Sequence, residues 1–175
     1  MDFSLLLCSA LWFFLPALVA NQSPGFARKL GLRWSRTPVW ERRLGPGKTW
    51  GAYYAGPLGA FATLYIQQRF PGINAAIGLF DYDRDIFIAA AALGFGAVLG
   101  DHVKSLFKRR RNIAPGARWW PWDQTDFVFG SIAISALTFV WIGWLNTMII
   151  IVFVVCIHPI GNRIGYELGL RDVPW

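Results

Sequence analysis

The longest uncharged stretch of the chain runs from Phe127 to Ile157, and it constrains the fold more than any other feature. It contains 31 residues without Asp, Glu, Lys or Arg. As one straight helix it would be about 46 Å long, well beyond the roughly 30 Å hydrocarbon core of a bilayer. The polar pair Asn146-Thr147 divides the stretch. We therefore expect two membrane-spanning helices, joined by a tight turn at Asn146-Thr147.

Further apolar segments earlier in the chain are long enough to form membrane helices. The chain is 55% hydrophobic and only 15% charged, which is typical of a membrane protein. A signal peptide would have a basic start, but Asp2 is the charge that precedes the first segment. The sequence thus predicts an all-α, polytopic membrane protein with about five transmembrane helices, built from residues 1–175 as one domain. The earlier segments are Phe3–Ala20, Gly51–Ile66 and the Ala- and Gly-rich Ile86–Gly100, whose small residues suit close helix packing.

The loops between these segments differ in positive charge. Lys and Arg number seven in residues 21–51, six in 100–126 and two in 158–175, which is 15 of the 17 in the chain. Arg69 and Arg84 are left for the opposite side. The positive-inside rule then predicts a plasma-membrane protein with its N-terminus outside and its C-terminus and basic loops in the cytoplasm. Because topology accounts for the net charge of +7, we expect no nucleic-acid partner.

The basic loop that ends at Asp126 combines carboxylates with cations in a regular pattern. If the preceding helix continues past Gly100, residues at positions i, i+3, i+4 and i+7 share one of its faces. Carboxylates at such a face suit a hard cation, and lysines suit phosphate groups. The pattern therefore indicates phosphate chemistry at a membrane surface. The four residues of this face are Asp101, Lys104, Ser105 and Lys108.

Each part of the pattern also has an ordinary structural interpretation. A basic cluster such as Arg109–Arg111 is typical of a topology signal beside anionic headgroups. Asp123 and Asp126, which open the next apolar segment, are typical of helix caps. Neither interpretation requires a carboxylate and a hydroxyl on the same helical face as two lysines. The combination therefore favours the phosphate hypothesis.

The turn Gly45–Thr49 resembles part of a phosphate-binding loop. A complete P-loop would need Gly where Arg42 stands, and no strand precedes the turn, so a Walker NTPase is excluded. The backbone N–H groups of such a turn, together with Lys48 and Thr49, can still hold an anion at a helix N-terminus.

Three other polar residues lie at the ends of apolar segments. Asn21 is expected at a helix end, where its side chain meets either water or a ligand. His158 and Asn162 are spaced i, i+4, and five spans would return them to the surface that carries Asp101 and Asp123. For His158 the alternative is a hydrogen-bonded residue at a helix end.

At this point several motifs together resemble one family, the CDP-archaeol synthases, over nearly the whole chain. Part of the basic loop is also similar to the signature of phosphatidate cytidylyltransferases, but the Lys-Asp and His-Gly-Gly parts of that longer signature are missing, which favours the archaeol branch. The motifs are PALVANQSP at 16–24, GPGKTW at 45–50, GDHVKSLFKRRRNIAPG at 100–116, DQTDF at 123–127 and HPIGNRIGYELGLRDVPW at 158–175.

The resemblance implies a CTP-dependent transfer of CMP to a membrane lipid phosphate in the bilayer, giving CDP-lipid and pyrophosphate with Mg²⁺ as cofactor. Metal ions and cations would supply most of the stabilisation of the transferred phosphoryl group. No general base is needed, because a phosphate is already anionic at neutral pH. The oligomeric state stays open, with a homodimer as one alternative. The expected metal ligands and catalytic carboxylates are Asp101, Asp123 and Asp126, with Lys108 as catalytic cation. The expected substrate-binding residues are Asn21, Lys48, Thr49, Lys104, Ser105, Arg109, His158 and Asn162.

Other functional classes fit the sequence less well. A phosphatidate cytidylyltransferase is the nearest enzymatic alternative. A CDP-alcohol phosphotransferase would carry a D-G-x-x-A-R element, which the sequence lacks. A small transport or structural membrane protein would not need the carboxylate cluster, and an ion pathway usually places charges within the spans.

Overall fold

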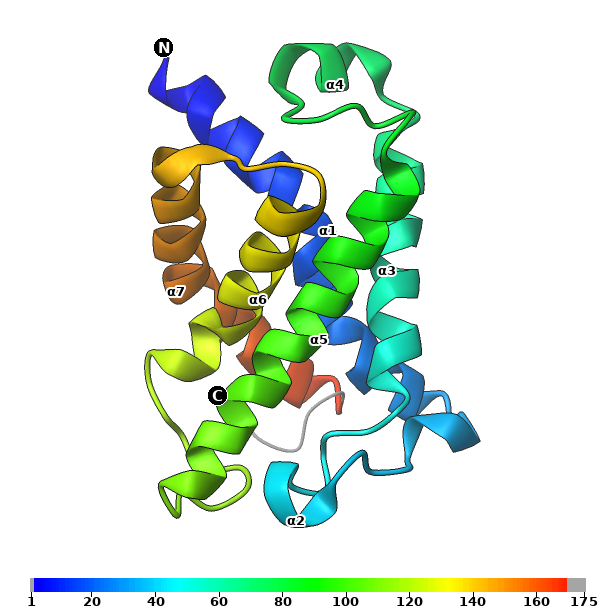
Figure 1. Ribbon diagram of the computed structural model, residues 1–175, viewed down its shortest axis with the longest axis vertical. Coiled ribbons are helices and arrows are strands. Elements are labelled where there is room, and N and C mark those ends of the chain that lie inside the picture. Colours follow the sequence, from blue (N-terminus) through cyan, green and yellow to red (C-terminus); the bar gives the residue numbers. More distant parts are fainter. Residues whose placement is uncertain (1, 170–175) are drawn as a thin grey trace.

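The computed structural model describes residues 2–169. In this part of the chain the regular secondary structure is helical, apart from an isolated backbone pairing between Pro38 and Thr49 (Figure 1). The all-α part of the predicted fold class is therefore confirmed. A short 3₁₀ helix spans Arg33–Ser35. The α-helices are α1 (Phe3–Lys29), α2 (Glu41–Leu44), α3 (Ala52–Gln67), α4 (Pro71–Ile77), α5 (Ile86–Arg110), α6 (Trp122–Thr138) and α7 (Gly143–Glu167).

Among the described residues, three helices are long and apolar enough to cross a membrane: α1, α5 and α7. This agrees with a polytopic membrane protein. The other two predicted spans correspond to α3 and α6, which are shorter, with 16 and 17 residues. Many large apolar side chains on the long helices point outward, including Phe87 and Trp144. Such faces suit a lipid surround better than water.

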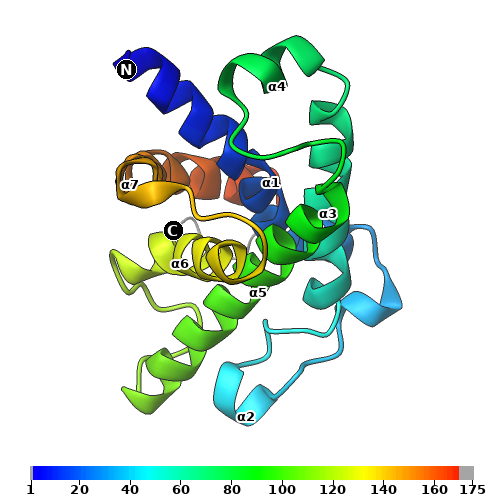
Figure 2. The same cartoon turned by 45° about the horizontal axis from the view of Figure 1, so that its top comes forward.

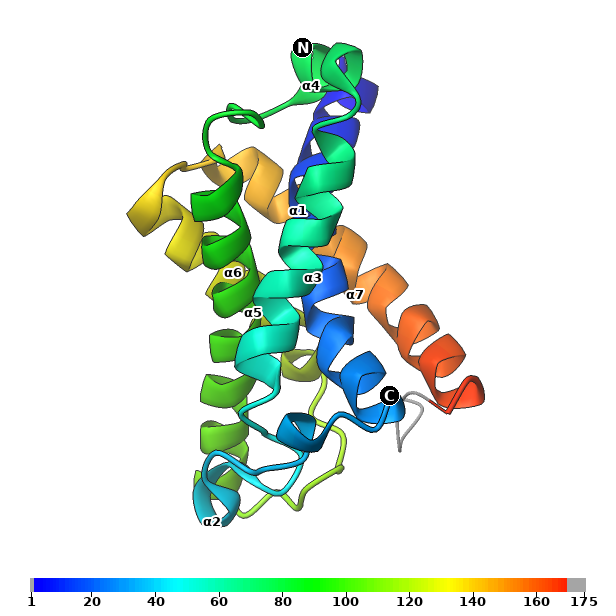
Figure 3. The same cartoon turned by 90° about the vertical axis from the view of Figure 1, so that its right-hand side faces the viewer.

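Helix α5 lies at the centre of the bundle, between α3 and α6, and also contacts α1 (Figures 1 and 3). Helix α7 packs against α1 and α6, so that α6 lies between α5 and α7 (Figure 2). The core contains Phe13 and Phe14 of α1, Leu93 of α5 and Phe127 of α6, all nearly inaccessible. The N-terminus and α4 lie at one end of the bundle, whereas α2 and the C-terminal end of α5 lie at the other (Figure 1).

Close packing of α5 against α6 depends on glycines, as the composition of the third apolar segment indicated. A Cβ atom at Gly96 would lie 2.6 Å from the Cα of Ser131, and one at Gly130 would collide with the Gly96 carbonyl oxygen. At Gly100 the obstacle would be the backbone of Asp126. Because these positions lack side chains, the two backbones can touch. This contact brings the start of α6 against the polar half of α5.

The predicted turn at Asn146-Thr147 is wrong. Both residues lie inside α7, and the chain turns earlier, at residues 139–142. The side chains of the pair are satisfied within the helix, because Asn146 Nδ2 donates to the Ile142 carbonyl at 2.7 Å and Thr147 Oγ1 to that of Gly143 at 2.9 Å. The turn instead ends at Gly143, whose φ of +80° favours glycine.

The first helix is also longer than its apolar segment. Helix α1 continues through Asn21 and Pro24 to Lys29, so Asn21 is not at a helix end as predicted. Its side chain is directed into the bundle, toward α7. At the other terminus, residues 170–175 of the final family motif lie outside the described residues.

Candidate active site

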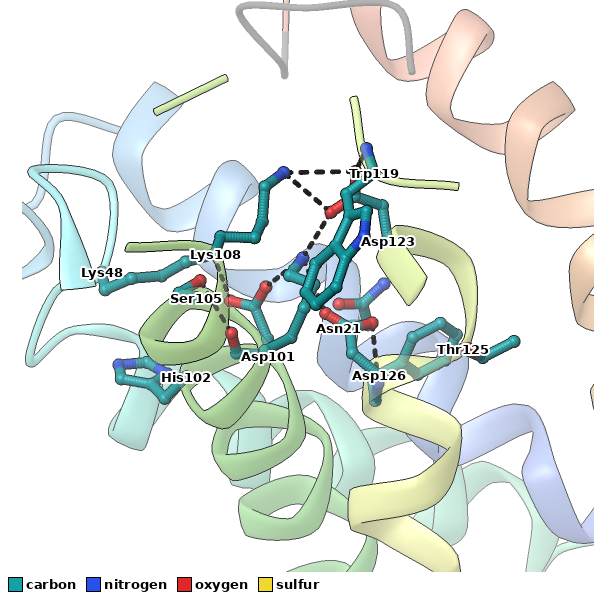
Figure 4. Close-up of polar contacts among 12 residues, drawn as sticks. Asn21, Lys48, Asp101, His102, Ser105, Lys108, Trp119, Asp123, Thr125 and Asp126 are labelled. Carbon is teal, nitrogen blue, oxygen red and sulfur yellow. Dashed lines mark hydrogen bonds and ion pairs between the residues drawn. The ribbon is translucent and has the colours of Figure 1, made fainter. Parts of the chain in front are cut away.

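Three segments bring charged side chains together at the end of the bundle that carries α2. The C-terminal half of α5 supplies Asp101 and Lys108, the first turns of α6 supply Asp123 and Asp126, and the loop before α3 supplies Lys48 (Figure 4). Helix α5 continues ten residues past Gly100, as the spacing argument required.

The predicted polar face of α5 exists. It lines a polar cavity of about 210 Å³. Val103 and Phe107 are about half exposed and line an apolar cavity instead. The α5 residues in the polar cavity are Asp101, Lys104, Ser105, Lys108 and Arg109.

Lys104 stands at the centre of the charged cluster. Its Nζ atom lies 2.8 Å from Oδ2 of Asp126, 3.1 Å from Oδ1 of Asp101 and 3.2 Å from Oδ1 of Asp123. One ammonium group therefore holds a carboxylate from α5 and two from α6. The Lys104 side chain is only 14% exposed, so these ion pairs are little screened by solvent.

Two further lysines complete the cluster. Lys48 Nζ pairs with Oδ2 of Asp101. Lys108 Nζ lies 3.0 and 3.2 Å from the two carboxylate oxygens of Asp123 and also donates to the Ala117 carbonyl oxygen. Burial lowers the pKa of the Lys48 ammonium group below its usual value, and the Asp101 carboxylate opposes that shift. Lys48, Lys104 and Lys108 balance Asp101, Asp123 and Asp126 in formal charge.

The aspartates of α6 do not act as its N-terminal cap. The N-cap is Pro121, without a side-chain capping hydrogen bond. Asp123 Oδ2 accepts a hydrogen bond from the Trp119 N–H at 2.5 Å, outside the helix. Asp126 Oδ1 accepts from the adjacent Phe127 N–H at 2.8 Å, while its other oxygen faces Lys104. Both carboxylates are thus directed into the charged cluster.

Two apolar cavities adjoin the polar one. The larger, about 740 Å³, lies along α1, α3, α5 and α7 and shares Gly47, Lys48 and Asp101 with the polar cavity. The other, about 610 Å³, lies between α5 and α6 beside Trp119 and Trp122, and reaches Lys104 and Asp126. Charged groups that face a small polar cavity are therefore accessible from two apolar grooves.

Some of the remaining predicted residues line the polar cavity and others do not. Asn162 of α7 is buried and lines the polar cavity, and among the described residues its Oδ1 atom has no hydrogen-bond partner. Ser105 lines the same cavity, although its hydroxyl donates to the Asp101 carbonyl at 2.8 Å. Thr49 is buried in the pairing with Pro38 and is not brought to the cavity with Lys48.

His158 and Asn21 meet each other inside the bundle. Asn21 Nδ2 lies 3.1 Å from His158 Nε2, and the His158 ring packs against Phe127 at 5.1 Å between centroids. Asn21 also lines the larger apolar cavity. The pair therefore joins α1 to α7 beside the cluster. His158 is hydrogen-bonded, as the alternative interpretation expected, but it lies inside α7 and not at a helix end.

Some groups of the site were not predicted from the sequence. The Ala117 carbonyl and the Trp119 N–H bind Lys108 and Asp123, but any residue type supplies these backbone groups. His102 was overlooked, although it is buried next to Asp101, with its Nδ1 2.7 Å from the Val98 carbonyl oxygen. Its position immediately after Asp101 was the one available indication.

The carboxylates have the right chemistry for Mg²⁺, since this ion prefers carboxylate and phosphate oxygens. Asp101, Asp123 and Asp126 already converge on one cation, the Lys104 ammonium group. Within residues 2–169, no three His, Cys, Asp or Glu side chains are spaced to hold a metal ion directly. The carboxylate oxygens lie 2.8–3.2 Å from Lys104 Nζ, whereas Mg²⁺ needs its ligand oxygens at about 2.0–2.1 Å.

Comparison with known proteins identifies the family. The model of the CarS-like CDP-archaeol synthases matches residues 3–175. The chain belongs to this family. A CDP-archaeol synthase of Methanospirillum hungatei is 35% identical over 172 residues, covering 92% of this chain and 99% of the relative. The corresponding protein of Methanocaldococcus jannaschii is 36% identical over 174 residues, covering 97% of this chain and 98% of the relative.

A solved structure agrees with this family assignment. It is that of an intramembrane enzyme for archaeal membrane lipids biosynthesis, with a TM-score of 0.67 and 26% sequence identity. The match covers 87% of this chain and 92% of the other. The CDP-archaeol synthase family is therefore supported by motifs, by overall sequence and by fold, and the protein is a multi-pass membrane protein.

Proposed function

We propose that this protein transfers CMP from CTP to an archaeol-type lipid phosphate, an unsaturated geranylgeranyl glycerol phosphate, releasing pyrophosphate. Family membership supports the reaction class. The structural observation that carries the proposal is the cluster of Lys48, Lys104 and Lys108 with three aspartates, where a polar cavity meets two apolar ones. A reaction between a nucleotide and a membrane lipid needs such a junction.

The polar cavity is proposed to receive the triphosphate of CTP. Lys48, Lys108 and Arg109 line it and would hold the phosphate oxygens, and the amide N–H groups of Asn162, which lines the same cavity, would donate to them. In the reaction a lipid phosphate oxygen attacks the α-phosphorus of CTP and pyrophosphate leaves in line. Negative charge then grows on the leaving oxygens, so fixed ammonium and guanidinium groups lower the barrier. At about 210 Å³ the cavity is smaller than a typical ligand pocket, and we place the rest of the nucleotide toward Gly47, in the loop before α3.

The lipid is proposed to enter from the side of the bundle. The groove between α5 and α6 has almost entirely apolar walls and leads to Lys104 and Asp126. An isoprenoid chain in such a groove would be shielded from water, and its phosphate would be held at the charged cluster. The groove along α1 offers a second apolar surface that reaches Lys48 and Asp101.

We also propose that the reaction depends on Mg²⁺, with Asp101, Asp123 and Asp126 as its ligands. The convergence of these three carboxylates on one cation supports this assignment. The ion would neutralise charge on the phosphates and orient them.

The positive charges of the loops support an orientation of the protein in the membrane. We propose five spans, with α3 and α6 crossing the membrane beside α1, α5 and α7. The charged cluster and the C-terminus then face the cytoplasm, where CTP is available, and the N-terminus faces outward. The excess of Lys and Arg in residues 21–51 and 100–126 supports this arrangement.

The proposal is tested with purified full-length protein, CTP and two lipid phosphates that differ in their chains and linkage. Geranylgeranylated glycerol phosphate should give CDP-lipid and pyrophosphate rapidly, and phosphatidic acid slowly. Preference for phosphatidic acid would reassign the substrate to diacyl lipids. If no CDP-lipid forms with either lipid, the proposed function is contradicted.

A further inference from the structure

We propose that Lys104 is an internal counter-ion that competes with the divalent cation for Asp101, Asp123 and Asp126. In this role it holds the metal ligands together before the metal binds, and it is released toward the phosphates when the carboxylates take the ion. The inference rests on the proposed Mg²⁺-dependent function. It concerns the metal-free state of the enzyme, which takes no part in the proposed transfer of CMP.

The geometry singles out Lys104 among the lysines of the cluster. Lys48 pairs with Asp101, and Lys108 pairs with Asp123. Lys104 contacts a carboxylate oxygen of all three aspartates, at 2.8 to 3.2 Å from Nζ. It therefore occupies the one point on which the three proposed metal ligands converge.

The same position cannot hold both cations. Three carboxylates that bind a common Mg²⁺ must bring their oxygens to about 2.0–2.1 Å from the ion. With the ammonium group between them, these oxygens lie 2.8–3.2 Å from Nζ, farther than the ligand distance of Mg²⁺. Lys104 must leave before these oxygens can close on the ion, so ammonium and metal binding exclude one another.

The displaced ammonium group has a destination nearby. Lys104 lines the polar cavity together with Arg109 and Lys108, and it also reaches the apolar groove between α5 and α6. A flexible four-carbon side chain can move its charge from a carboxylate to a phosphate without a backbone change. Metal binding would thus convert Lys104 from a partner of the metal ligands into a phosphate-binding group.

The cluster gives a physical reason for such an exchange. Three carboxylates this close repel one another, and leaving them without a cation in a poorly solvated site would be costly. Lys104 keeps them charged and aligned when no nucleotide is bound. The consequence is weaker binding of free metal, so that the ion should bind best together with the anionic triphosphate.

The test is Mn²⁺ binding to detergent-solubilised full-length protein without nucleotide, measured by electron paramagnetic resonance of the free ion. Lys104→Met should bind Mn²⁺ at least about tenfold more tightly than the wild type, since one neighbouring charge shifts ion affinity by one or more powers of ten. Arg109→Met is the matched control, because Arg109 lines the same cavity. It removes the same charge without removing an ammonium group from the carboxylates, so it should change affinity less. Equal Mn²⁺ affinity in the two variants would overturn the inference.

A second measurement uses the wild-type protein, in case Lys104→Met does not fold. The rate at which an amine-specific reagent labels Lys104 is followed by mass spectrometry. Addition of Mg²⁺ alone should raise this rate several-fold, and Lys29, whose ammonium group donates to the Leu168 carbonyl, serves as the internal control. A labelling rate of Lys104 that does not respond to Mg²⁺ would contradict the proposal.

Turnover separates this inference from the proposed function. If CDP-lipid formation requires a divalent cation but Lys104→Met does not tighten Mn²⁺ binding, the role of Lys104 is wrong and the function stands. If turnover proceeds equally well without divalent cations, the proposed metal dependence fails, and the counter-ion role fails with it.

Discussion

Gly100 of α5 lies directly against the backbone of Asp126 of α6. A Cβ atom at Gly100 would collide with the Asp126 carbonyl oxygen and lie 3.1 Å from the Cα of Phe127. The absence of a side chain at this position sets the distance between the helices that carry the charged cluster. The geometry of the charged cluster therefore depends on the packing of α5 against α6 at Gly100.

Gly100→Ala is expected to separate α5 from α6 and disturb the site. Overpacking of this kind costs about 1–3 kcal/mol, and the displacement should weaken the Lys104–Asp126 pair. We expect turnover to fall at least tenfold while the protein remains inserted in the membrane. Gly72→Ala is the control, because nothing lies within 4 Å of a Cβ atom there. Normal turnover of Gly100→Ala would show that the spacing is not critical.

The carboxylates of α6 provide a second test. Asn caps a helix nearly as well as Asp, and the N-cap of α6 is Pro121 in any case. Asp123→Asn and Asp126→Asn should therefore keep the fold but lose the charge that binds Lys104 and the proposed metal. We expect CDP-lipid formation to fall about 10²- to 10³-fold in each variant, corresponding to 3–4 kcal/mol of transition-state stabilisation. Near-normal rates would remove these residues from the catalytic site.

The polar face of α5 could be predicted from sequence because helical periodicity alone defines it. Asp101, Ser105 and Lys108 needed only a helix that continues past Gly100. Periodicity does not determine which side chains meet across two helices. The sequence placed Lys104 among phosphate-binding groups, whereas the structure pairs it with three aspartates.

The boundaries of the helices were harder to predict than their existence. Asn146 and Thr147 appeared to interrupt an apolar stretch, but their side chains bind carbonyl groups one turn earlier and remain helical. Asn21 appeared to end a helix for the same reason, although it contacts His158 from inside α1. A polar residue within an apolar segment therefore does not by itself mark a helix end, because its side chain can be satisfied inside the helix or by a neighbouring helix.

The proposed orientation is tested with compartment reporters on the full chain. A reporter after Trp175 should be cytoplasmic, and one inserted within residues 70–80, between α3 and α5, should be outside. This follows from the concentration of Lys and Arg in the loops on the proposed cytoplasmic side. Detection of both reporters in one compartment would exclude the five-span arrangement.

The apolar grooves predict a strong dependence on lipid chain length. Each buried CH₂ group contributes about 0.8 kcal/mol, so glycerol phosphates with short, water-soluble chains should be poor substrates. We expect kcat/KM to rise steeply as the isoprenoid chains lengthen. Equal turnover of glycerol phosphate and its long-chain derivative would mean that the grooves beside Lys104 and Lys48 do not bind the lipid.

The central claim is that the charged cluster catalyses the transfer of CMP. The most direct test follows which phosphorus atom of CTP enters the lipid. Purified protein is incubated with geranylgeranylated glycerol phosphate and with CTP labelled either at its α- or at its γ-phosphorus. Asp126→Asn is run in parallel. The account predicts that α-label appears in the lipid, that γ-label appears in pyrophosphate, and that Asp126→Asn greatly slows both. Transfer of γ-label to the lipid, or full activity of Asp126→Asn, would contradict it.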